Sequence, residues 1–386
     1  MRRTIGVVTV ARSDYGHLRP LLSEIRDAPN LTPLLFVAGS HLAERFGATV
    51  GEIEADGWCI AERIETVDPH DDGAAIARSI GRAVSGFGGA LVRHRPDLLL
   101  VLGDRYEMLG AALAALPLTL PVAHVHGGEV TEGAIDEQLR HALTKLAHVH
   151  FVAAEPFARR LQQMGEEAWR IHCVGAPGLD RFRTLRYLDR EELARRVGVA
   201  LTRPTLLVTF HPVTLEPDRT ETYVTELLGA LAEVDATLIV SFPGADTSSG
   251  AIIRRLESFA TGRARVRLVS SLGDDVYASL LREVDAMVGN SSSGLIEAPS
   301  FSLPVVNVGH RQGGRLRAAN VIDVDYGRAS IAAGIRRALD PAFAASLKGL
   351  RNPYGDGHAS PRIVQALQEV KLDARLVQKR FVDLPG

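Results

Sequence analysis

The feature that most constrains the fold is a regular alternation of short apolar runs with longer helical patterns. Runs rich in leucine or β-branched residues occupy residues 5–10, 32–37, 98–102, 122–125 and 150–153. After a charged helical stretch over residues 180–199, a second series occupies residues 206–210, 237–242, 266–269, 286–288 and 305–308. Continuous apolar strands separated by helices are typical of a parallel sheet covered on both faces. The sequence therefore predicts an α/β chain of two doubly wound, Rossmann-like domains.

The chain length supports this division, since 386 residues are enough for two domains. We expect the join between residues 174 and 205, and place the first domain at residues 1–178 and the second at residues 179–359. A charged helical pattern over residues 371–380 predicts that the C-terminal segment, residues 360–386, packs back on the first domain.

Composition excludes several classes of protein. A net charge of -2 and a sequence pI near 6.7 give no electrostatic footprint for nucleic acid or an anionic membrane. The two cysteines, Cys59 and Cys173, are too few for a disulfide framework and fit a reducing cytoplasm. The basic and then apolar start is too short for a signal peptide, and prolines interrupt the other long apolar run, near residues 109–122. We expect a cytoplasmic protein with no nucleic-acid or membrane partner.

Ligands of doubly wound sheets bind outside the carboxyl ends of the strands, so the residues that follow each apolar run are the candidates. The residues at these positions are Arg12, Gly39-Ser40, Gly103-Asp104-Arg105, the turn 126–129, His211, Pro243-Gly244, and the turn 289–294.

The most informative of these turns runs from Gly289 to Glu297. It reads as a strand that ends at Gly289-Asn290, a turn containing Ser291 and Ser292, and a helix that carries Glu297 in its early turns. Free backbone N–H groups and small hydroxyls suit a phosphate, whereas Glu297 suits a neutral group with hydroxyls such as a ribose. An ordinary capped helix explains the same residues equally well.

Two further strand ends carry groups for proton transfer. Asp104 can act as base, acid or hydroxyl clamp, or can cap a helix that starts at Tyr106. His124 and His126 lie on one face of a strand, but no further ligand has metal spacing, so a metal site is disfavoured. The following loop supplies acids for chemistry at a sugar carbon, some of which are explained as first-turn helix acids: Glu129, Glu132, Asp136 and Glu137.

In the second series, His211 precedes Pro212 and is expected to project from the strand end, although a structural histidine is the commoner case. Arg311 lies in a glycine-rich loop and can hold a phosphate or a base carbonyl. Neither a dinucleotide fingerprint GxGxxG after the first strand nor a P-loop GxxxxGK[ST] occurs, and a serine nucleophile elbow is also missing. We expect no cofactor and no metal.

The ordered motifs resemble the UDP-N-acetylglucosamine 2-epimerase family, and within it the hydrolysing branch that feeds sialic acid and related nonulosonic acids. They span nearly the whole chain: residues 9–15, Gly103-Asp104-Arg105, 124–129, 135–137 with Arg140-His141, 208–214, 289–294 and Arg311-Gln312. The resemblance implies the glycosyltransferase B type fold, a UDP-sugar bound in the cleft between two Rossmann-like domains, no redox cofactor, no metal, and a homodimer or homotetramer.

The resemblance also implies residue roles. Asp104, His126, Glu129, Asp136 and His211 are the expected catalytic residues. The expected substrate contacts are Arg12, His17, Arg105, His211, Gly289, Asn290, Ser291, Ser292, Glu297 and Arg311. His126 stands where many relatives have a catalytic glutamate, so the base that acts at C2 stays open among these groups.

The implied reaction eliminates UDP across C1 and C2 and then adds water with inversion at C2. The expected products are UDP and N-acetylmannosamine, or the 2,4-diacetamido-2,4,6-trideoxymannose analogue if the substrate is UDP-diacetylbacillosamine. A nonhydrolysing epimerase and a glycosyltransferase of the same fold are the alternative enzymes, and a catalytically silent nucleotide-sugar sensor is a third reading.

Overall fold

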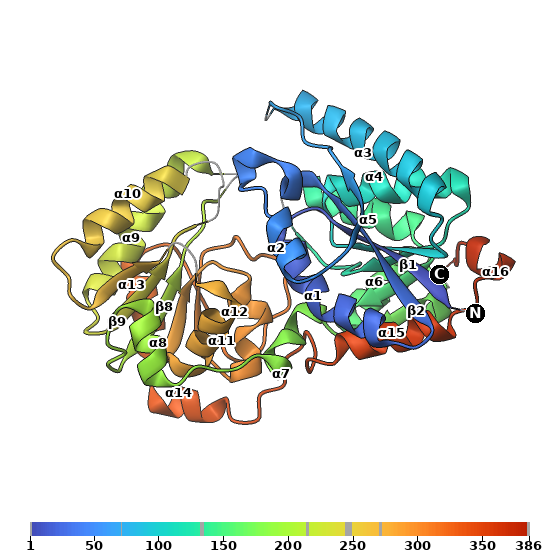
Figure 1. Cartoon of the computed structure of the whole chain (residues 1–386). Coiled ribbons are helices and arrows are strands. Elements are labelled where there is room, and N and C mark those ends of the chain that lie inside the picture. Colours follow the sequence, from blue (N-terminus) through green and yellow to red (C-terminus); the bar gives the residue numbers. More distant parts are fainter. Residues whose placement is uncertain are drawn as a thin grey trace. The chain divides into compact units, whose positions relative to one another are not determined.

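The computed structural model describes residues 2–70, 72–131, 135–213, 216–243, 249–269 and 272–383. It divides into two compact units, each with its own parallel sheet (Figure 1). Unit 1 comprises Met1–Arg183 and Tyr354–Gly386, and unit 2 comprises Thr184–Pro353. Three residues named in the sequence analysis, Glu132, Thr214 and Gly244, lie outside the described residues.

Unit 1 is built on a seven-stranded sheet of order β3-β2-β1-β4-β5-β6-β7, and every neighbouring pair is parallel. Its strands are β1 (Arg3–Thr9), β2 (Leu31–Ala38), β3 (Ile60–Ile64), β4 (Leu98–Leu102), β5 (Val122–Val125), β6 (Val149–Val152) and β7 (Ile171–Cys173). Its α-helices are α1 (Arg12–Asp27), α2 (Val50–Ala55), α3 (Gly73–His94), α4 (Tyr106–Ala115), α5 (Ile135–Leu146), α6 (Glu155–Gln163), α15 (Ala359–Glu369) and α16 (Ala374–Val377), with α7 (Arg181–Thr184) at the boundary.

Helices cover both faces of this sheet because successive strand residues point to opposite sides. Val7 belongs to the cluster formed with α1 and α15, whereas Val8 belongs to the cluster formed with α3 and α4. The C-terminal helices α15 and α16, red in Figure 1, thus lie with elements from the start of the chain. The predicted helical tail over 371–380 contains only the short helix α16, which begins at an Asp373 cap.

Unit 2 is built on a six-stranded parallel sheet of order β10-β9-β8-β11-β12-β13. Its strands are β8 (Thr205–Thr209), β9 (Thr237–Ser241), β10 (Val266–Val269), β11 (Ala286–Gly289), β12 (Val305–Val308) and β13 (Val321–Val324). Its α-helices are α8 (Arg190–Val197), α9 (Thr220–Ala232), α10 (Ser249–Ala260), α11 (Gly273–Glu283), α12 (Ser293–Ile296), α13 (Arg328–Ala338) and α14 (Pro341–Ser346).

Local sequence signals set several helix limits in unit 2. Asp189 caps α8 by accepting the N–H of Glu192 at 2.8 Å, and Gly198 ends the helix in the left-handed region at φ +79°. The apolar core packs the sheet against α9, α10 and α13, with Val208, Leu227 and Ile335 fully buried.

The prediction of two doubly wound α/β domains is confirmed. In both sheets the strand order reverses beside the first strand, between β1 and β4 and between β8 and β11. Crevices for ligands form at such reversal points, at the carboxyl ends of the strands. None of the helices in the described ranges is both long and apolar enough to cross a membrane.

Candidate active site

The loop after β1 leads directly into α1, which carries two of the predicted substrate contacts. Arg12 is the first residue of α1, and its guanidinium lies 3.2 Å from the Glu52 carboxylate on α2. His17 lies on the same helix and is partly buried; desolvation lowers its pKa to about 3, so the ring is neutral at physiological pH. Gly178 allows this position, because a Cβ there would lie 2.0 Å from Nδ1 of His17.

Asp104, after β4, pairs with Arg140 of α5 and does not cap a helix. Arg140 is 3% exposed; it donates a hydrogen bond to Asp104 and another, 3.0 Å long, to the Thr131 hydroxyl. Helix α4 starts at Tyr106 with no side-chain cap. Asp104 is therefore held as an ion-paired carboxylate in the structure, and the sequence analysis assigned no role to its partner.

Arg105 points its charge toward two buried acids that the sequence analysis also missed. Its Nε lies 3.4 Å from Glu107, which is fully buried on α4. Asp14 of α1 accepts the Val10 N–H at 2.7 Å, and burial raises its pKa to about 6. Burial opposes the charge of Arg105, but Glu107 and Asp14 outweigh it and raise the pKa of the guanidinium. The two acids thus hold Arg105 in its charged form.

His126 and Glu129 form a close pair at the end of β5. Nδ1 of His126 lies 2.6 Å from Oε1 of Glu129, and the two side chains are 14% and 8% exposed. Nε2 of His126 makes no hydrogen bond within the described residues. The neighbouring His124 instead uses its Nε2 on the Gly103 carbonyl at 2.7 Å, which is a structural role.

The backbone of this turn is held in a conformation that non-glycine residues rarely adopt. His126 has φ +67°, and its N–H donates to the Phe151 carbonyl at 3.0 Å. Gly128 has φ +76° and lies so close to α6 that a Cβ there would be 2.6 Å from the Phe157 carbonyl oxygen. Strain of this kind persists where surrounding structure fixes it, and it often accompanies function.

The acids of α5 lie in its first turn, as the sequence analysis considered. Glu137 accepts the Thr131 N–H at 2.6 Å and contacts His141 at 3.1 Å. Asp136 has no hydrogen bond or ion pair with any described residue. Among the described residues its carboxylate thus has no structural partner, in contrast to those of Asp104 and Glu137.

In unit 2 the serine turn follows β11 as predicted, but the helix after it is different. Helix α12 contains only Ser293–Ile296, and Glu297 lies at its C-terminal end before a 3₁₀ turn over Ala298–Phe301. The prediction of a helix with Glu297 in its early turns is wrong because Pro299 cannot continue an α-helix. Glu297 accepts a hydrogen bond from Ser293 at 2.5 Å, and Ser293 also contacts Tyr277.

Asn290 ties the strand ends of unit 2 together. Its buried amide accepts the His211 N–H at 2.7 Å and donates to the His211 carbonyl at 2.9 Å. Its own carbonyl accepts from Gln312 at 2.8 Å and from Arg311 at 3.2 Å. Gly289 allows this close approach of β8 and β11, since a Cβ there would lie 1.9 Å from the Thr209 carbonyl oxygen. The predicted residues His211, Asn290 and Arg311 are thus brought together.

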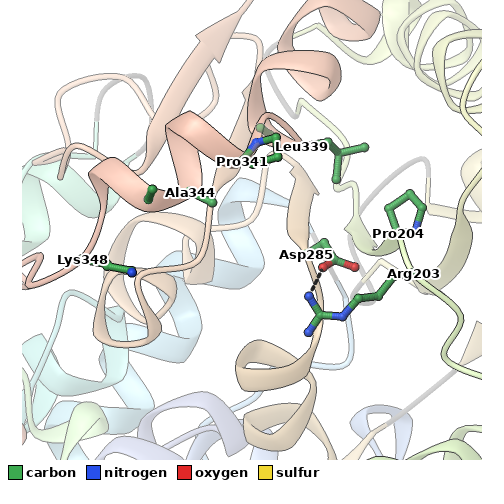
Figure 2. A pocket seen from close by; sticks show the side chains of 9 residues that line it. Arg203, Pro204, Asp285, Leu339, Pro341, Ala344 and Lys348 are labelled. Atoms are coloured by element: carbon green, nitrogen blue, oxygen red, sulfur yellow. Dashed lines mark hydrogen bonds and ion pairs between the residues drawn. The ribbon is translucent and has the colours of Figure 1, made fainter.

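A separate cavity of about 670 Å³ lies at the amino ends of β8 and β11 (Figure 2). Its charged groups include Lys348 and an ion pair between Arg203 and Asp285, whose nitrogen and oxygen lie 2.8 Å apart. Because ligands of such sheets bind at the carboxyl ends, this cavity is not the candidate site. Within the described ranges, no group of three or more His, Cys, Asp or Glu side chains is placed to hold a metal ion.

Comparison with known proteins gives a consistent result. The sequence profile of the UDP-N-acetylglucosamine 2-epimerase family matches residues 23–368. This chain belongs to that family. It is 38% identical to the hydrolysing UDP-N,N'-diacetylbacillosamine 2-epimerase of Legionella pneumophila, across 98% of this chain and 99% of the relative. It is 34% identical to the hydrolysing GDP/UDP-N,N'-diacetylbacillosamine 2-epimerase of Campylobacter jejuni, across 99% of this chain and all of the relative.

The fold of this family member matches those of solved relatives. The UDP-GlcNAc 2-epimerase of Neisseria meningitidis, solved with UDP-GlcNAc bound, gives a TM-score of 0.82 at 16% identity, covering 95% of this chain and 100% of that one. A UDP-N-acetylglucosamine 2-epimerase structure from Listeria monocytogenes gives 0.78 at 17% identity, covering 95% and 96%. The predicted glycosyltransferase B type fold is confirmed.

Proposed function

We propose that this protein is a hydrolysing UDP-sugar 2-epimerase that acts on UDP-N,N'-diacetylbacillosamine. The products are UDP and 2,4-diacetamido-2,4,6-trideoxymannose, a precursor for nonulosonic acid synthesis. Two relatives named for that substrate match the chain over essentially their whole length at 38% and 34% identity. The relative named as the UDP-N-acetylglucosamine 2-epimerase of Neisseria meningitidis matches at 30%. UDP-GlcNAc is therefore the second candidate substrate.

The observation that carries the reaction type is the gathering of proton-transfer groups at the strand ends of unit 1. The His126–Glu129 pair follows β5, Asp104 follows β4, and α5 adds the uncommitted Asp136. Elimination across C1 and C2 needs a base at C2, and the later protonation of C2 from the other face needs a second group. A sugar transfer to an acceptor needs neither step at C2.

Unit 2 supplies groups that suit the leaving nucleotide. We propose that Ser291, Ser292 and Arg311, with His211 beside them, bind the diphosphate, and that Glu297 binds the ribose. Asn290 and Gln312 hold these loops in place through the backbone of His211 and Asn290. Positively charged and hydrogen-bonding side chains that contact the diphosphate stabilise the negative charge that develops as UDP departs. In unit 1, Arg12, His17 and Arg105 are the proposed contacts with the rest of the substrate.

The test is incubation of the purified protein with each UDP-sugar and no acceptor. We expect release of UDP together with a free sugar of the manno configuration, identified by NMR, and faster turnover of the diacetylbacillosamine substrate. A product still attached to UDP would indicate the nonhydrolysing reaction, and UDP release only with an added acceptor would indicate a glycosyltransferase. Binding without turnover would indicate a sensor.

We also propose that the protein works in the cytoplasm as a homodimer or homotetramer. Its two cysteines are exposed and unpaired, which suits a reducing compartment. Unit 1 exposes the apolar side chains Val92, Leu116 and Leu118 at 52%, 53% and 39%. Such a group of exposed apolar residues is typical of an interaction surface. Light scattering at assay concentration tests this, and a monomeric mass would contradict it.

A further inference from the structure

The pair His126–Glu129 has the geometry of a base held by a carboxylate. An ionised carboxylate can only accept hydrogen bonds, so the 2.6 Å contact places the ring proton of His126 on Nδ1. The lone pair of the neutral ring then lies on Nε2, which has no hydrogen bond within the described residues. A histidine whose second nitrogen is fixed by a carboxylate has a defined tautomer and orientation.

The other acids of the site are less suited to take a proton from carbon. Asp104 is ion-paired with the buried Arg140, and Glu137 already accepts a backbone N–H and contacts His141. Asp136 is uncommitted, but the reaction needs a second group on the opposite face of the sugar. Nε2 of His126, which has no hydrogen bond within the described residues, is therefore available for one half of the reaction, and Asp136 for the other.

We propose that His126 accepts the C2 proton of the UDP-sugar, and that Glu129 is the positioning residue that fixes the His126 ring. This inference rests on the proposed function and names the base that the sequence left open. The C2–H proton passes to Nε2, the C–H electron pair forms the C1=C2 bond, and the C1–O pair leaves with UDP. In the second half, a group on α5 delivers a proton to C2 from the other face, water adds to C1 and returns a proton to that group, and the imidazolium loses its proton to solvent.

The groups around His126 favour protonation of its ring during the reaction. Glu129 contributes a carboxylate from the same turn. His17 of α1 packs edge-on with ring centroids 5.8 Å apart, and His124 lies on β5 two residues before. Burial lowers the pKa of both to about 3, so they add no competing positive charge. Cations nearby include Arg181, which acts on His17, and Arg160, which donates a hydrogen bond to the Gly128 carbonyl in the same turn.

The left-handed backbone at His126 provides an unusually clean test. Glycine adopts φ near +67° without strain, so His126→Gly removes the ring and leaves the turn in place. Wild-type activity on the UDP-sugar is measured first, and its absence would overturn the proposed function itself. With activity established, we expect His126→Gly to lose about 10²–10⁴-fold in UDP release. We expect added imidazole to restore part of the loss, with an unchanged melting temperature.

The matched control is His358→Gly, since His358 also sits near a carboxylate, 3.6 Å from Asp356, but is half exposed. It should keep the wild-type rate and show no response to imidazole. If His126→Gly is inactive and imidazole fails to restore it, Glu129→Gln decides. A fall in kcat of about tenfold or more with KM unchanged, and a larger isotope effect with C2-deuterated substrate, supports the pair. Full activity of His126→Gly, or an unrescued loss with an unchanged kcat in Glu129→Gln, overturns it.

Discussion

Two of the histidine–glutamate pairs of unit 1 have their histidines at the neighbouring strands β5 and β6, and their surroundings differ completely. His126 and Glu129 meet at 2.6 Å just beyond the end of β5. His150, within β6, meets Glu166 at 3.0 Å, and both side chains are fully buried. The same two residue types therefore occur once at a strand end, where ligands bind, and once inside the fold.

In the His150–Glu166 pair, the charge of the carboxylate is already compensated by lysines. Glu166 accepts Lys145 at 2.6 Å and Lys379 at 2.7 Å in addition to His150. Lys379, from the C-terminal tail, also donates to the carbonyls of Thr144 and Lys145 at the end of α5. Two lysines thus compensate Glu166, and burial lowers the pKa of His150. The His150–Glu166 pair and its lysines thus connect the C-terminal tail and α5 to the sheet. Glu129, by contrast, can stabilise a charged His126.

A short histidine–carboxylate contact therefore does not by itself identify a base. What distinguishes His126 is its position at a strand end and its strained backbone, since a second ring nitrogen without a hydrogen bond among the described residues occurs in both His126 and His150. Changes that treat the two pairs alike should therefore give opposite results, one on activity and the other on stability.

The largest expected effect is a loss of catalysis when the His126–Glu129 pair is changed. His126→Gln should reduce kcat by about 10²–10⁴-fold while changing the free energy of unfolding by less than about 1 kcal/mol. Steady-state assays and urea unfolding measure the two quantities. A near wild-type kcat in His126→Gln would show that the His126–Glu129 pair is not catalytic.

The next effect is on stability at the inner pair. Glu166→Gln leaves the largely buried Lys379 without its counter-charge, and breaking a buried ion pair costs about 3–5 kcal/mol. Glu129→Gln is the matched control, since the amide still accepts from His126 and no buried lysine is left unpaired. Equal melting temperatures for the two variants would contradict this account of Glu166.

Acid should destabilise the fold through buried neutral histidines. Burial lowers the pKa of His41 and His148 to about 4, and of His17 and His124 to about 3. The folded protein then binds fewer protons than the unfolded chain below about pH 6.5, so stability falls as pH drops from there toward 4.

Asp14 acts in the opposite direction. Its raised pKa stabilises the fold below about pH 6 as the pH falls toward 3.8, which offsets part of the loss from the histidines. We expect a net loss of stability between pH 7 and 5, measured by urea unfolding, because four histidines outweigh one aspartate. Constant stability over that range would show that the histidines are not held neutral.

The smallest expected effect comes from the tail. Lys379→Met removes one charged partner of Glu166, and a hydrogen bond to a charged group contributes about 1.5–3 kcal/mol. Lys145 remains, so Glu166 keeps a counter-charge and the loss should be smaller than in Glu166→Gln. Thermal unfolding of the two variants side by side checks this order, and the reverse order would be inconsistent with it.

The central strands and the edge strand β10 were predictable because they are continuous apolar runs, but the edge strands β3, β7 and β13 were not. β3 carries Glu62 and Arg63, and β13 carries Asp323, so neither resembles a buried strand. The strand-end rule located Asp104, His126 and His211, since it depends only on where the apolar runs stop. It could not locate Arg140 or the Asn290–His211 link, because those contacts depend on how distant loops meet.

Hydrolytic epimerisation by this chain requires that a proton moves at C2 and that the sugar is released from UDP. Turnover of UDP-N,N'-diacetylbacillosamine in D₂O, followed by NMR of the product, tests it most directly. The account predicts a free sugar of the manno configuration that carries deuterium at C2. Retention of the original proton at C2 would contradict it.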